Sequence, residues 1–268
     1  MAKRIIASLV LFPLLALLIV LGGIYLQVAL TVIILIAMWE VYHAFSRKPS
    51  GVSWIGYIFA IVYMYFADNL TESHVLFMLI TVFTIITLMM SVFFHETITV
   101  KDCAVTIIGF FYVAILMSTI YLTRVSPYGK FFVWLSFIAA WGCDTGAYFT
   151  GMAIGKHKLV PKLSPKKTVE GAVGGIVLAT LIALLYGWTV SRFSSIQDVN
   201  ILGFCGVAGF VGSILSQFGD LTASAIKRFT GVKDYGKLIP GHGGIMDRFD
   251  SVLFTAPAIY IVMVAMIR

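Results

Sequence analysis

Residues 216–250, SQFGDLTASAIKRFTGVKDYGKLIPGHGGIMDRFD, gather charged side chains in a chain that is otherwise strongly apolar. Carboxylates and cations are interleaved along this stretch: Asp220, Lys227, Arg228, Lys233, Asp234, Lys237, His242, Asp247, Arg248 and Asp250. Carboxylate oxygens are ligands for hard divalent cations, whereas basic side chains and backbone N–H groups bind phosphoryl oxygens. The stretch therefore predicts a site for a metal ion and a phosphorylated substrate.

A polar helical face opens this stretch. Gln217, Asp220 and Ser224 recur three and four residues apart, and Lys227 and Arg228 continue the spacing. On an apolar segment such a face needs a wet cavity or polar partners, so we interpret it as part of a site. The alternative is a membrane helix end at which long cations reach the headgroups and pair with acids one turn away.

A run rich in Gly and Pro follows, in which Gly243 and Gly244 allow close approach of a ligand and backbone amides can bind phosphate oxygens. Asp247 and Asp250 come next, three residues apart at the start of a predicted last helix, so both can face the same way. Helix N-capping would account for one of these acids. A role of His242 in proton transfer is a further alternative.

Asp144 is an isolated acid in the apolar run at residues 131–154. We place it in the cytoplasmic half of the membrane, where a carboxylate costs about 3 kcal/mol on insertion scales and usually faces a cavity or a partner. Gly142, Thr145 and Gly146 leave room for a close partner, for which Asp220, Asp247 and the lysines are the candidates. A hydrogen bond between packed helices is the structural alternative.

The segment at residues 155–168, GKHKLVPKLSPKKT, is rich in Lys and contains two prolines, so we expect it to be extended and cationic. Lys166 and Lys167 precede a helix whose N-terminus, near Glu170, favours anions. Ser164 and Thr168 add hydroxyl groups beside these lysines. Membrane topology alone would supply the lysines, but it would not explain the compact SPKKTVEG arrangement.

The composition shows what must position these residues. Of the 268 residues, 60% are hydrophobic and 12% are charged, which indicates an all-α polytopic membrane protein. One bilayer crossing needs roughly 20 apolar residues, and about nine such runs are present. They lie at residues 5–22, 24–42, 52–67, 74–94, 103–122, 131–154, 171–190, 199–219 and 251–267.

We divide the chain into an N-terminal membrane region at residues 1–123, with about five spans, and a catalytic region at residues 124–268, with about four spans and two cytoplasmic active-site loops. The first run is longer than a signal-peptide core and lacks a cleavage site, so we expect a retained helix. The three cysteines have no metal-binding or disulfide spacing, and we expect them in the core: Cys103, Cys143 and Cys205.

The distribution of Lys and Arg predicts the orientation. A cytoplasmic N-terminus and an external C-terminus put most of the 19 Lys and Arg residues inside, as the positive-inside rule requires. The exceptions are Arg124, Lys130, Arg192 and Arg268. Glu40 and His43 then lie near a cytoplasmic helix end, where we expect the headgroup layer to solvate them.

These motifs resemble those of the phosphatidate cytidylyltransferase family, also called CDP-diacylglycerol synthases. The C-terminal signature of that family is matched without departure at residues 224–250, and SPKKTVEG is similar to its second motif. The resemblance implies that CTP and phosphatidic acid are converted into CDP-diacylglycerol and pyrophosphate with Mg2+, at the cytoplasmic face of the plasma (inner) membrane. It leaves open a second metal ion and a homodimer, and it implies no nucleic-acid partner.

Roles for individual residues follow from the resemblance as expectations. Metal binding is expected of Asp144, Asp220 and Asp247. A catalytic role is expected of Asp144, Lys167, Asp220, Lys227, Asp247, Arg248 and Asp250. Substrate binding is expected of Ser164, Lys166, Thr168, Ser224, Arg228, Lys233, Lys237, His242, Gly243 and Gly244.

Two other functions use similar residues. A CTP-dependent lipid-alcohol kinase, of the polyprenol or phytol type, needs the same triphosphate and metal groups but transfers the γ-phosphoryl group to a hydroxyl. A cation-coupled transporter would use intramembrane acids as an ion path. The transporter predicts acids toward both membrane faces and an internal repeat, and the sequence shows neither feature.

Overall fold

The computed structural model describes most of the chain. The residues outside the description are Met1, 47–49, 70–72, Ser195, Gln197, 239–242 and Arg268, and the side chains of residues 2–11, Asn69 and Ser73 are also not described. The prediction for His242 therefore lies outside the described residues.

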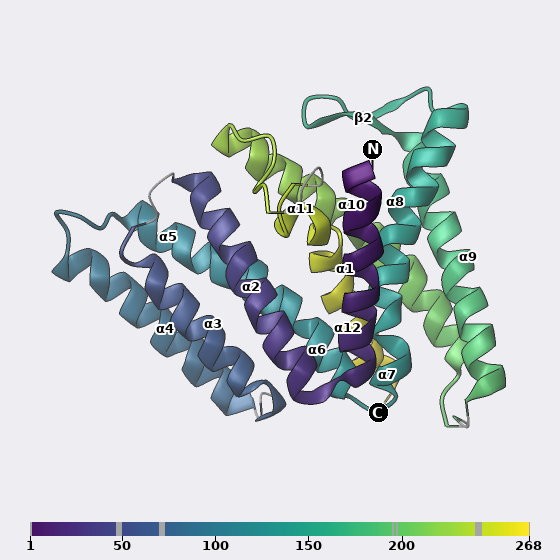
Figure 1. Ribbon diagram of the computed structural model, residues 1–268, viewed down its shortest axis with the longest axis horizontal. Coiled ribbons are helices and arrows are strands. Elements are labelled where there is room, and N and C mark those ends of the chain that lie inside the picture. The colour runs from purple at the N-terminus through teal and green to yellow at the C-terminus, as the bar shows by residue number, and fades with distance from the viewer. Residues whose placement is uncertain are drawn as a thin grey trace. The chain divides into compact units, whose positions relative to one another are not determined.

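The described chain is mainly helical, as the sequence predicts (Figure 1). Helices long and apolar enough to cross a membrane are Gly23–Phe45, His74–Phe93, Val100–Val125, Val169–Phe193 and Ile201–Thr230. Shorter apolar helices cover Phe12–Leu21, Ser53–Tyr65 and Val252–Met266. The protein is therefore a multi-pass membrane protein, whereas nine spans and the orientation stay predictions.

The chain forms two compact units. The first unit comprises Met1–Val125 and Thr230–Arg248, and the second comprises Ser126–Phe229 and Phe249–Arg268. Residues that follow the long helix Ile201–Thr230 thus pack with the N-terminal helices.

The first unit contains α1 (Ala2–Leu21), α2 (Gly23–Phe45), α3 (Ser53–Tyr65), η1 (Ala67–Asn69), α4 (Ser73–Phe93), α5 (Val100–Gly109), the π-helical segment η2 (Phe110–Ile115), α6 (Leu116–Val125) and most of the short α11 (Met246–Phe249). Gly22 and Gly23 separate α1 from α2 with positive φ angles of 63° and 49°, which glycine adopts at little cost. In this unit α2, α3 and α4 lie side by side (Figure 1). Tyr42 of α2 is buried against Gly56 of α3 and Gly109 of α5, and its hydroxyl donates a hydrogen bond to the Thr106 carbonyl at 3.1 Å.

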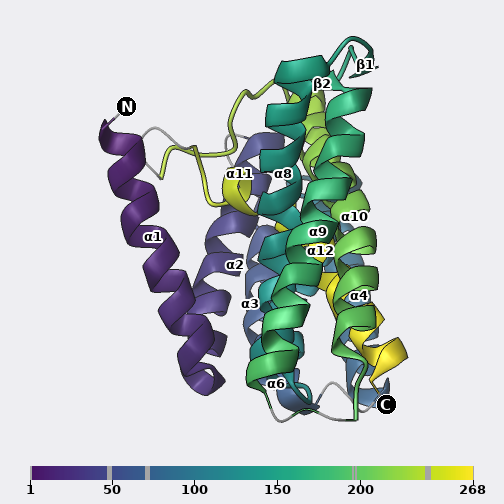
Figure 2. The ribbon, with the colours of Figure 1, turned by 90° about the vertical axis from the view of Figure 1, so that its right-hand side faces the viewer.

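The second unit contains α7 (Gly129–Phe132), α8 (Trp134–Ile154), β1 (Lys158–Val160), β2 (Ser164–Thr168), α9 (Val169–Phe193), α10 (Ile201–Thr230) and α12 (Val252–Met266). Figure 2 shows α8, α9 and α10 side by side, with β1 and β2 joining α8 to α9. The core of this unit includes Phe132, Leu135, Phe204 and Ile259. The predicted core position of the cysteines is confirmed, because all three are buried and unbridged.

Small residues let α8 and α9 approach closely. A Cβ atom on Gly146 would lie 2.9 Å from the Leu178 Cβ and 3.1 Å from the Gly175 Cα. Gly142 likewise faces Ala179, whose Cα would be 3.5 Å from an added Cβ. Membrane helices pack tightly where such residues meet, because there is no side chain to separate the two backbones.

Candidate functional site

The cationic segment predicted between α8 and α9 is an antiparallel hairpin of β1 and β2. Lys158 pairs with Thr168 and Val160 pairs with Ser164, so the segment is extended, as its prolines predict. Thr168 is also the N-cap of α9, where its side-chain oxygen accepts the Gly171 N–H at 3.1 Å. The hairpin therefore leads directly into the first turn of α9.

Glu170 fixes the other end of this hairpin. Its carboxylate accepts the backbone N–H groups of Lys156 at 3.1 Å and His157 at 3.2 Å, and it lies 2.6 Å from the His157 Nδ1. These contacts tie the beginning of the hairpin to the first turn of α9. The SPKKTVEG motif predicted a phosphate-binding helix start, but no local pattern in it indicates this role of Glu170.

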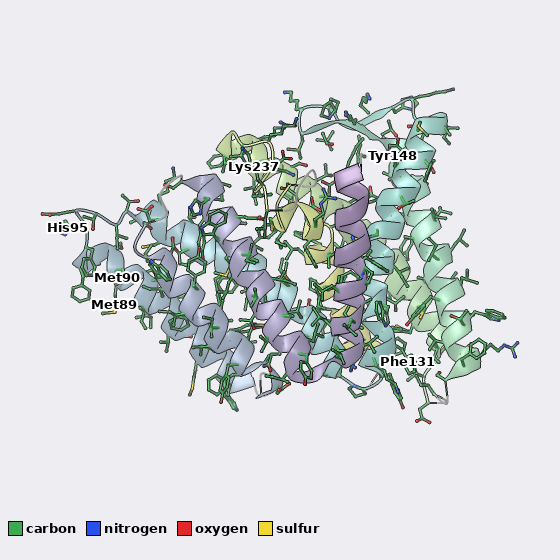
Figure 3. All side chains as sticks on the ribbon, in the orientation of Figure 1. Met89, Met90, His95, Phe131, Tyr148 and Lys237 are labelled. Atoms are coloured by element: carbon green, nitrogen blue, oxygen red, sulfur yellow. The ribbon has the colours of Figure 1, made fainter. Side chains whose placement is uncertain are left out.

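A cavity of about 410 Å3 lies against the hairpin within the second unit. Its lining residues are Asp144, Ala147, Tyr148, Gly151, Met152, Leu159, Lys166, Lys167, Thr168, Gly171, Ala172, Gln217 and Asp220. Figure 3 shows Tyr148 on the half of α8 nearest β2, whereas Phe131 lies toward the opposite end of this helix. The wall thus combines carboxylates and lysines with apolar side chains, which suits a substrate that carries both charge and apolar surface.

An ion pair joins two elements in this cavity. The Lys167 Nζ on β2 binds the Asp220 carboxylate on α10, and the two side chains are 24% and 27% exposed. Asp144 on α8 lines the same cavity. Asp144, Lys167 and Asp220 thus line one cavity of the second unit. The predicted meeting of Asp144 and Asp220 with Asp247, a residue of the first unit, stays a prediction.

Gln217 lies one turn before Asp220 and connects three helices. Its side-chain nitrogen donates a hydrogen bond to the Ala172 carbonyl on α9 at 3.0 Å and a weaker one to the Cys143 Sγ on α8 at 3.6 Å. The predicted polar face of α10 thus faces a cavity at Gln217 and Asp220. Gln217 also orients this part of the helix against α8 and α9.

The glycines beside Asp144 do not have the predicted role. Gly142 and Gly146 pack against α9 and leave no room for an acidic or basic partner of Asp144. Asp144 is two residues from each of them and projects from another face of the helix, because successive residues are about 100° apart. Its Oδ2 accepts a hydrogen bond from the Ser251 hydroxyl at 3.3 Å.

Asp250 adds a third carboxyl group to this region. Its Oδ1 accepts the Ser251 backbone N–H at 2.7 Å. Burial raises the pKa of Asp250 to about 7, the negative charges of Asp220 and Asp144 also raise it, and Lys227 lowers it. Asp250 therefore interacts electrostatically with both Asp220 and Asp144.

This set of donors fits a divalent cation in its chemistry. Among the residues that the structure describes, no three His, Cys, Asp or Glu side chains already form a metal-binding group. However, the negative charges of Asp144 and Asp220 both repel that of Asp250, and a hard cation would relieve that repulsion through carboxylate oxygens. We therefore regard Asp144 and Asp220 as candidate ligands, with Asp250 beside them.

Asp247 lies in the first unit, on α11, and holds backbone groups there. Its Oδ2 accepts the N–H groups of Tyr235 at 2.9 Å and Gly244 at 3.0 Å. Gly243 has φ +85°, and a Cβ atom there would lie 2.7 Å from the same oxygen, so this turn requires glycine. Asp247 thus holds the backbone at Tyr235 and Gly244 against the start of α11.

The prediction that Asp247 and Asp250 begin the last helix together is wrong. α11 ends at Phe249 and α12 begins at Val252, so Asp247 is on α11 and Asp250 lies in the turn between the two helices. At the break, the Asp250 side chain accepts the Ser251 N–H. A spacing of three residues therefore does not place them on one helical face.

Glu40 was also predicted wrongly. Headgroup solvation was expected, but the side chain is fully buried, and its carboxylate accepts the N–H groups of Ile245 and Met246 at 3.0 and 2.8 Å. His43 contacts the Trp39 carbonyl through Nδ1 at 2.9 Å. The available signal for Glu40 was an acid within an apolar run, the same signal that singled out Asp144.

The remaining predicted residues divide between the two units. The second unit contains Ser164, Lys166, Thr168, Ser224, Lys227 and Arg228, and the first unit contains Lys233, Lys237, Gly243, Gly244 and Arg248. Exposed cations among them are Lys166, Arg228, Lys233, Lys237 and Arg248. Figure 3 labels Lys237 in the loop that precedes α11.

Comparisons with known proteins agree with this chemistry. A family model described as the cytidylyltransferase family matches residues 2–266. A Staphylococcus haemolyticus protein named phosphatidate cytidylyltransferase is 32% identical over 265 residues, which cover 98% of the chain and 97% of that protein. A Staphylococcus aureus protein of the same name is 33% identical, with coverage of 97% and 96%. A Bacillus subtilis protein, also of that name, is 40% identical over 142 residues, covering 53% and 51%.

Proposed function

The chain belongs to the cytidylyltransferase family, and from this premise we propose that it is a phosphatidate cytidylyltransferase. It would transfer CMP from CTP to phosphatidic acid and form CDP-diacylglycerol and pyrophosphate. Relatives with this name match nearly the whole chain. The structural observation that carries the proposal is the cavity in which Lys167 pairs with Asp220 and which Asp144 also lines.

The reaction needs positioning and charge neutralisation more than an activated nucleophile. A phosphate oxygen of phosphatidic acid attacks the α-phosphorus of CTP, and the bond from that phosphorus to the oxygen bridging the β-phosphorus breaks. Both reactants are polyanions, so they repel one another until cations lie between them. Lys166 and Lys167 are held at the cavity by the hairpin, where each can bind phosphate oxygens.

We further propose that the enzyme is Mg2+-dependent. Asp144 and Asp220 would hold the ion, with Asp250 beside them, and Asp247 remains a predicted ligand from the first unit. Bound there, Mg2+ would neutralise charge on the triphosphate and on the departing pyrophosphate. A second ion remains an open part of the proposal.

The membrane arrangement belongs to the same proposal. We place the enzyme in the plasma (inner) membrane with nine spans, a cytoplasmic N-terminus, an external C-terminus and a cytoplasmic active site. The distribution of Lys and Arg supports this orientation. Residues 1–123 would then be a membrane scaffold for the catalytic region. Homodimerisation remains a prediction, which the molecular mass of the purified protein in detergent would test.

Position-specific labelling of CTP tests the activity. Purified protein is mixed with phosphatidic acid and CTP labelled at the α-phosphorus or at the γ-phosphorus. We expect label from the α-phosphorus in the lipid product and label from the γ-phosphorus in pyrophosphate. A lipid-alcohol kinase would give the opposite result with a polyprenol or phytol, so lipid labelled from the γ-phosphorus would overturn the proposal.

A further inference from the structure

The carboxylate of Glu40 is the buried end of a polar network inside the first unit. The side chain is 0% exposed and lies near the C-terminal end of the mainly apolar helix α2. Its Oε1 accepts the Ile245 N–H at 3.0 Å, and its Oε2 accepts the Met246 N–H at 2.8 Å. A buried carboxylate is costly unless its oxygens are satisfied, so these contacts stabilise one specific position of residues 245 and 246.

Two glycines close around the same carboxylate. A Cβ atom on Gly236 would lie 2.3 Å from the Glu40 Oε1, and a Cβ atom on Gly244 would lie 2.3 Å from both oxygens. These distances are shorter than any that a real side chain adopts. The backbone at positions 236 and 244 therefore packs directly on the carboxylate, and any residue other than glycine would displace it.

Gly244 connects this anchor to Asp247. Its N–H donates a hydrogen bond to the Asp247 Oδ2 at 3.0 Å, while its Cα side contacts Glu40. Tyr235, next to Gly236, donates its N–H to the same Asp247 oxygen at 2.9 Å. Both backbone groups that bind Asp247 are thus linked to the Glu40 carboxylate. Gly244 contacts it directly, and Tyr235 is linked to it through the adjacent Gly236.

We propose that Glu40 is a positioning residue for the reaction, an inference that rests on the proposed function. Its carboxylate anchors residues 235–236 and 243–246 to α2 and thereby sets the orientation of the Asp247 carboxylate. Glu40 itself does not touch substrate. The anchor explains why a charged side chain occupies a buried position in an apolar helix.

The substitution Glu40→Gln tests this inference with almost no change in volume. The amide NH2 would face one of the two backbone N–H groups, and that hydrogen bond would be lost. Because groups that orient a reacting side chain typically contribute 10- to 100-fold, we expect kcat to fall by about 10- to 100-fold. The KM for CTP should change by less than about threefold, since Glu40 does not bind CTP.

Hydrogen–deuterium exchange provides a readout that does not depend on activity. In purified Glu40→Gln protein, the peptide covering residues 243–249 should exchange faster than in the wild type, because the Ile245 and Met246 amides lose an acceptor. The matched control is Glu96→Gln, the same chemical change at an exposed residue. It should alter neither exchange nor kcat.

A second control separates positioning from general stability. Gln27 is buried on the same helix and donates a hydrogen bond to the Met64 carbonyl, roughly 20 Å along the helix from Glu40. Gln27→Leu should lower thermal stability but leave the exchange of residues 243–249 and the kcat of the folded protein unchanged.

Each outcome decides the question. Wild-type kcat and wild-type exchange in Glu40→Gln would overturn the inference, and so would an equal loss of kcat in Gln27→Leu. If Glu40→Gln does not fold, Gly236→Ala carries the test, because it keeps Glu40 and presses on its carboxylate. Normal exchange and kcat in that variant would also overturn the inference. A wild-type protein that incorporates no cytidine would instead overturn the proposed function, while the exchange experiment would still report on the anchor.

Discussion

Lys167→Gln is the substitution that most directly tests the assignment of the cavity. The Lys167 Nζ pairs with Asp220 on the wall that Asp144 also lines. Removing this cation has two separate consequences. Asp220 loses its partner in the resting protein, and the triphosphate loses a positive charge in the transition state.

The two magnitudes follow from the environment of the pair. The side chains are 24% and 27% exposed, so the pair lies between an exposed one and a fully buried one. Breaking an exposed ion pair costs about 0–1 kcal/mol, and breaking a fully buried one costs about 3–5 kcal/mol. For Lys167→Gln we therefore expect a loss of about 1–2 kcal/mol in the free energy of unfolding. Removing a preorganised group that stabilises transition-state charge costs about 3–4 kcal/mol, so kcat/KM should fall by about 100- to 1,000-fold.

Cytidine incorporation into lipid, with thermal unfolding measured in parallel, separates the two effects. Lys158→Gln is the matched control, because Lys158 is exposed on β1 and does not line the cavity. The double variant Lys167→Asp with Asp220→Lys restores the ion pair, so it should regain stability without regaining activity. Our reasoning is refuted if Lys167→Gln keeps activity within about threefold of the wild type or if the exchanged pair restores turnover.

Three further predictions concern the second unit. Chelation of divalent cations should abolish cytidine incorporation into lipid, and added Mg2+ should restore it. In the same assay, the kcat of Asp144→Asn should be about 100-fold or more below that of the wild type, even with excess Mg2+. Gly146→Ala should destabilise the protein by about 1–3 kcal/mol in thermal unfolding, because its Cβ would lie 2.9 Å from the Leu178 Cβ, whereas the exposed Thr145→Ala should not. Burial and the negative charge of Asp220 raise the pKa of Asp250 from 3.8 to about 7, so the folded state binds this proton more tightly than the unfolded state. Without divalent cations, stability should therefore fall as pH rises from about 4 to about 7, and Asp250→Asn should remove this slope.

Local sequence patterns predicted the parts of the site that depend on local geometry. Prolines and lysines excluded a helix at residues 155–168, and the structure has a hairpin there. The three-residue spacing on α10 placed Gln217 and Asp220 together, and both line the cavity. Helical periodicity is set by the backbone, so neither inference required knowledge of distant segments.

Predictions failed where a partner had to be identified. Gly142 and Gly146 were interpreted as space for a partner of Asp144, but they contact α9. A glycine looks the same in a sequence whether a neighbouring helix or a ligand fills the space beside it. The partners of Glu40 are 205 and 206 residues away, and no periodic pattern connects positions so far apart.

The acids of this protein divide according to what their oxygens accept. Glu40 and Glu170 each accept backbone N–H groups from two consecutive residues, Ile245 with Met246 and Lys156 with His157. In both cases the bound residues lie just before or at the start of a helix or strand, where the backbone offers no acceptor for their N–H groups. A segment of this kind beside a membrane must find acceptors elsewhere, because unsatisfied N–H groups are costly in an apolar environment.

Asp144 and Asp220 belong to the other group, because their carboxylates line a cavity and interact with a hydroxyl and a lysine. Asp247 accepts two backbone N–H groups, as the first group does, and the family resemblance predicts a metal-binding role for it, as for Asp144 and Asp220. Substitution of an acid in the first group should therefore show itself first as faster amide exchange of the segment it holds. Substitution in the second group should change metal dependence and turnover while leaving amide exchange unchanged. Measuring both quantities on the same variants would assign Asp247 to one role or to both.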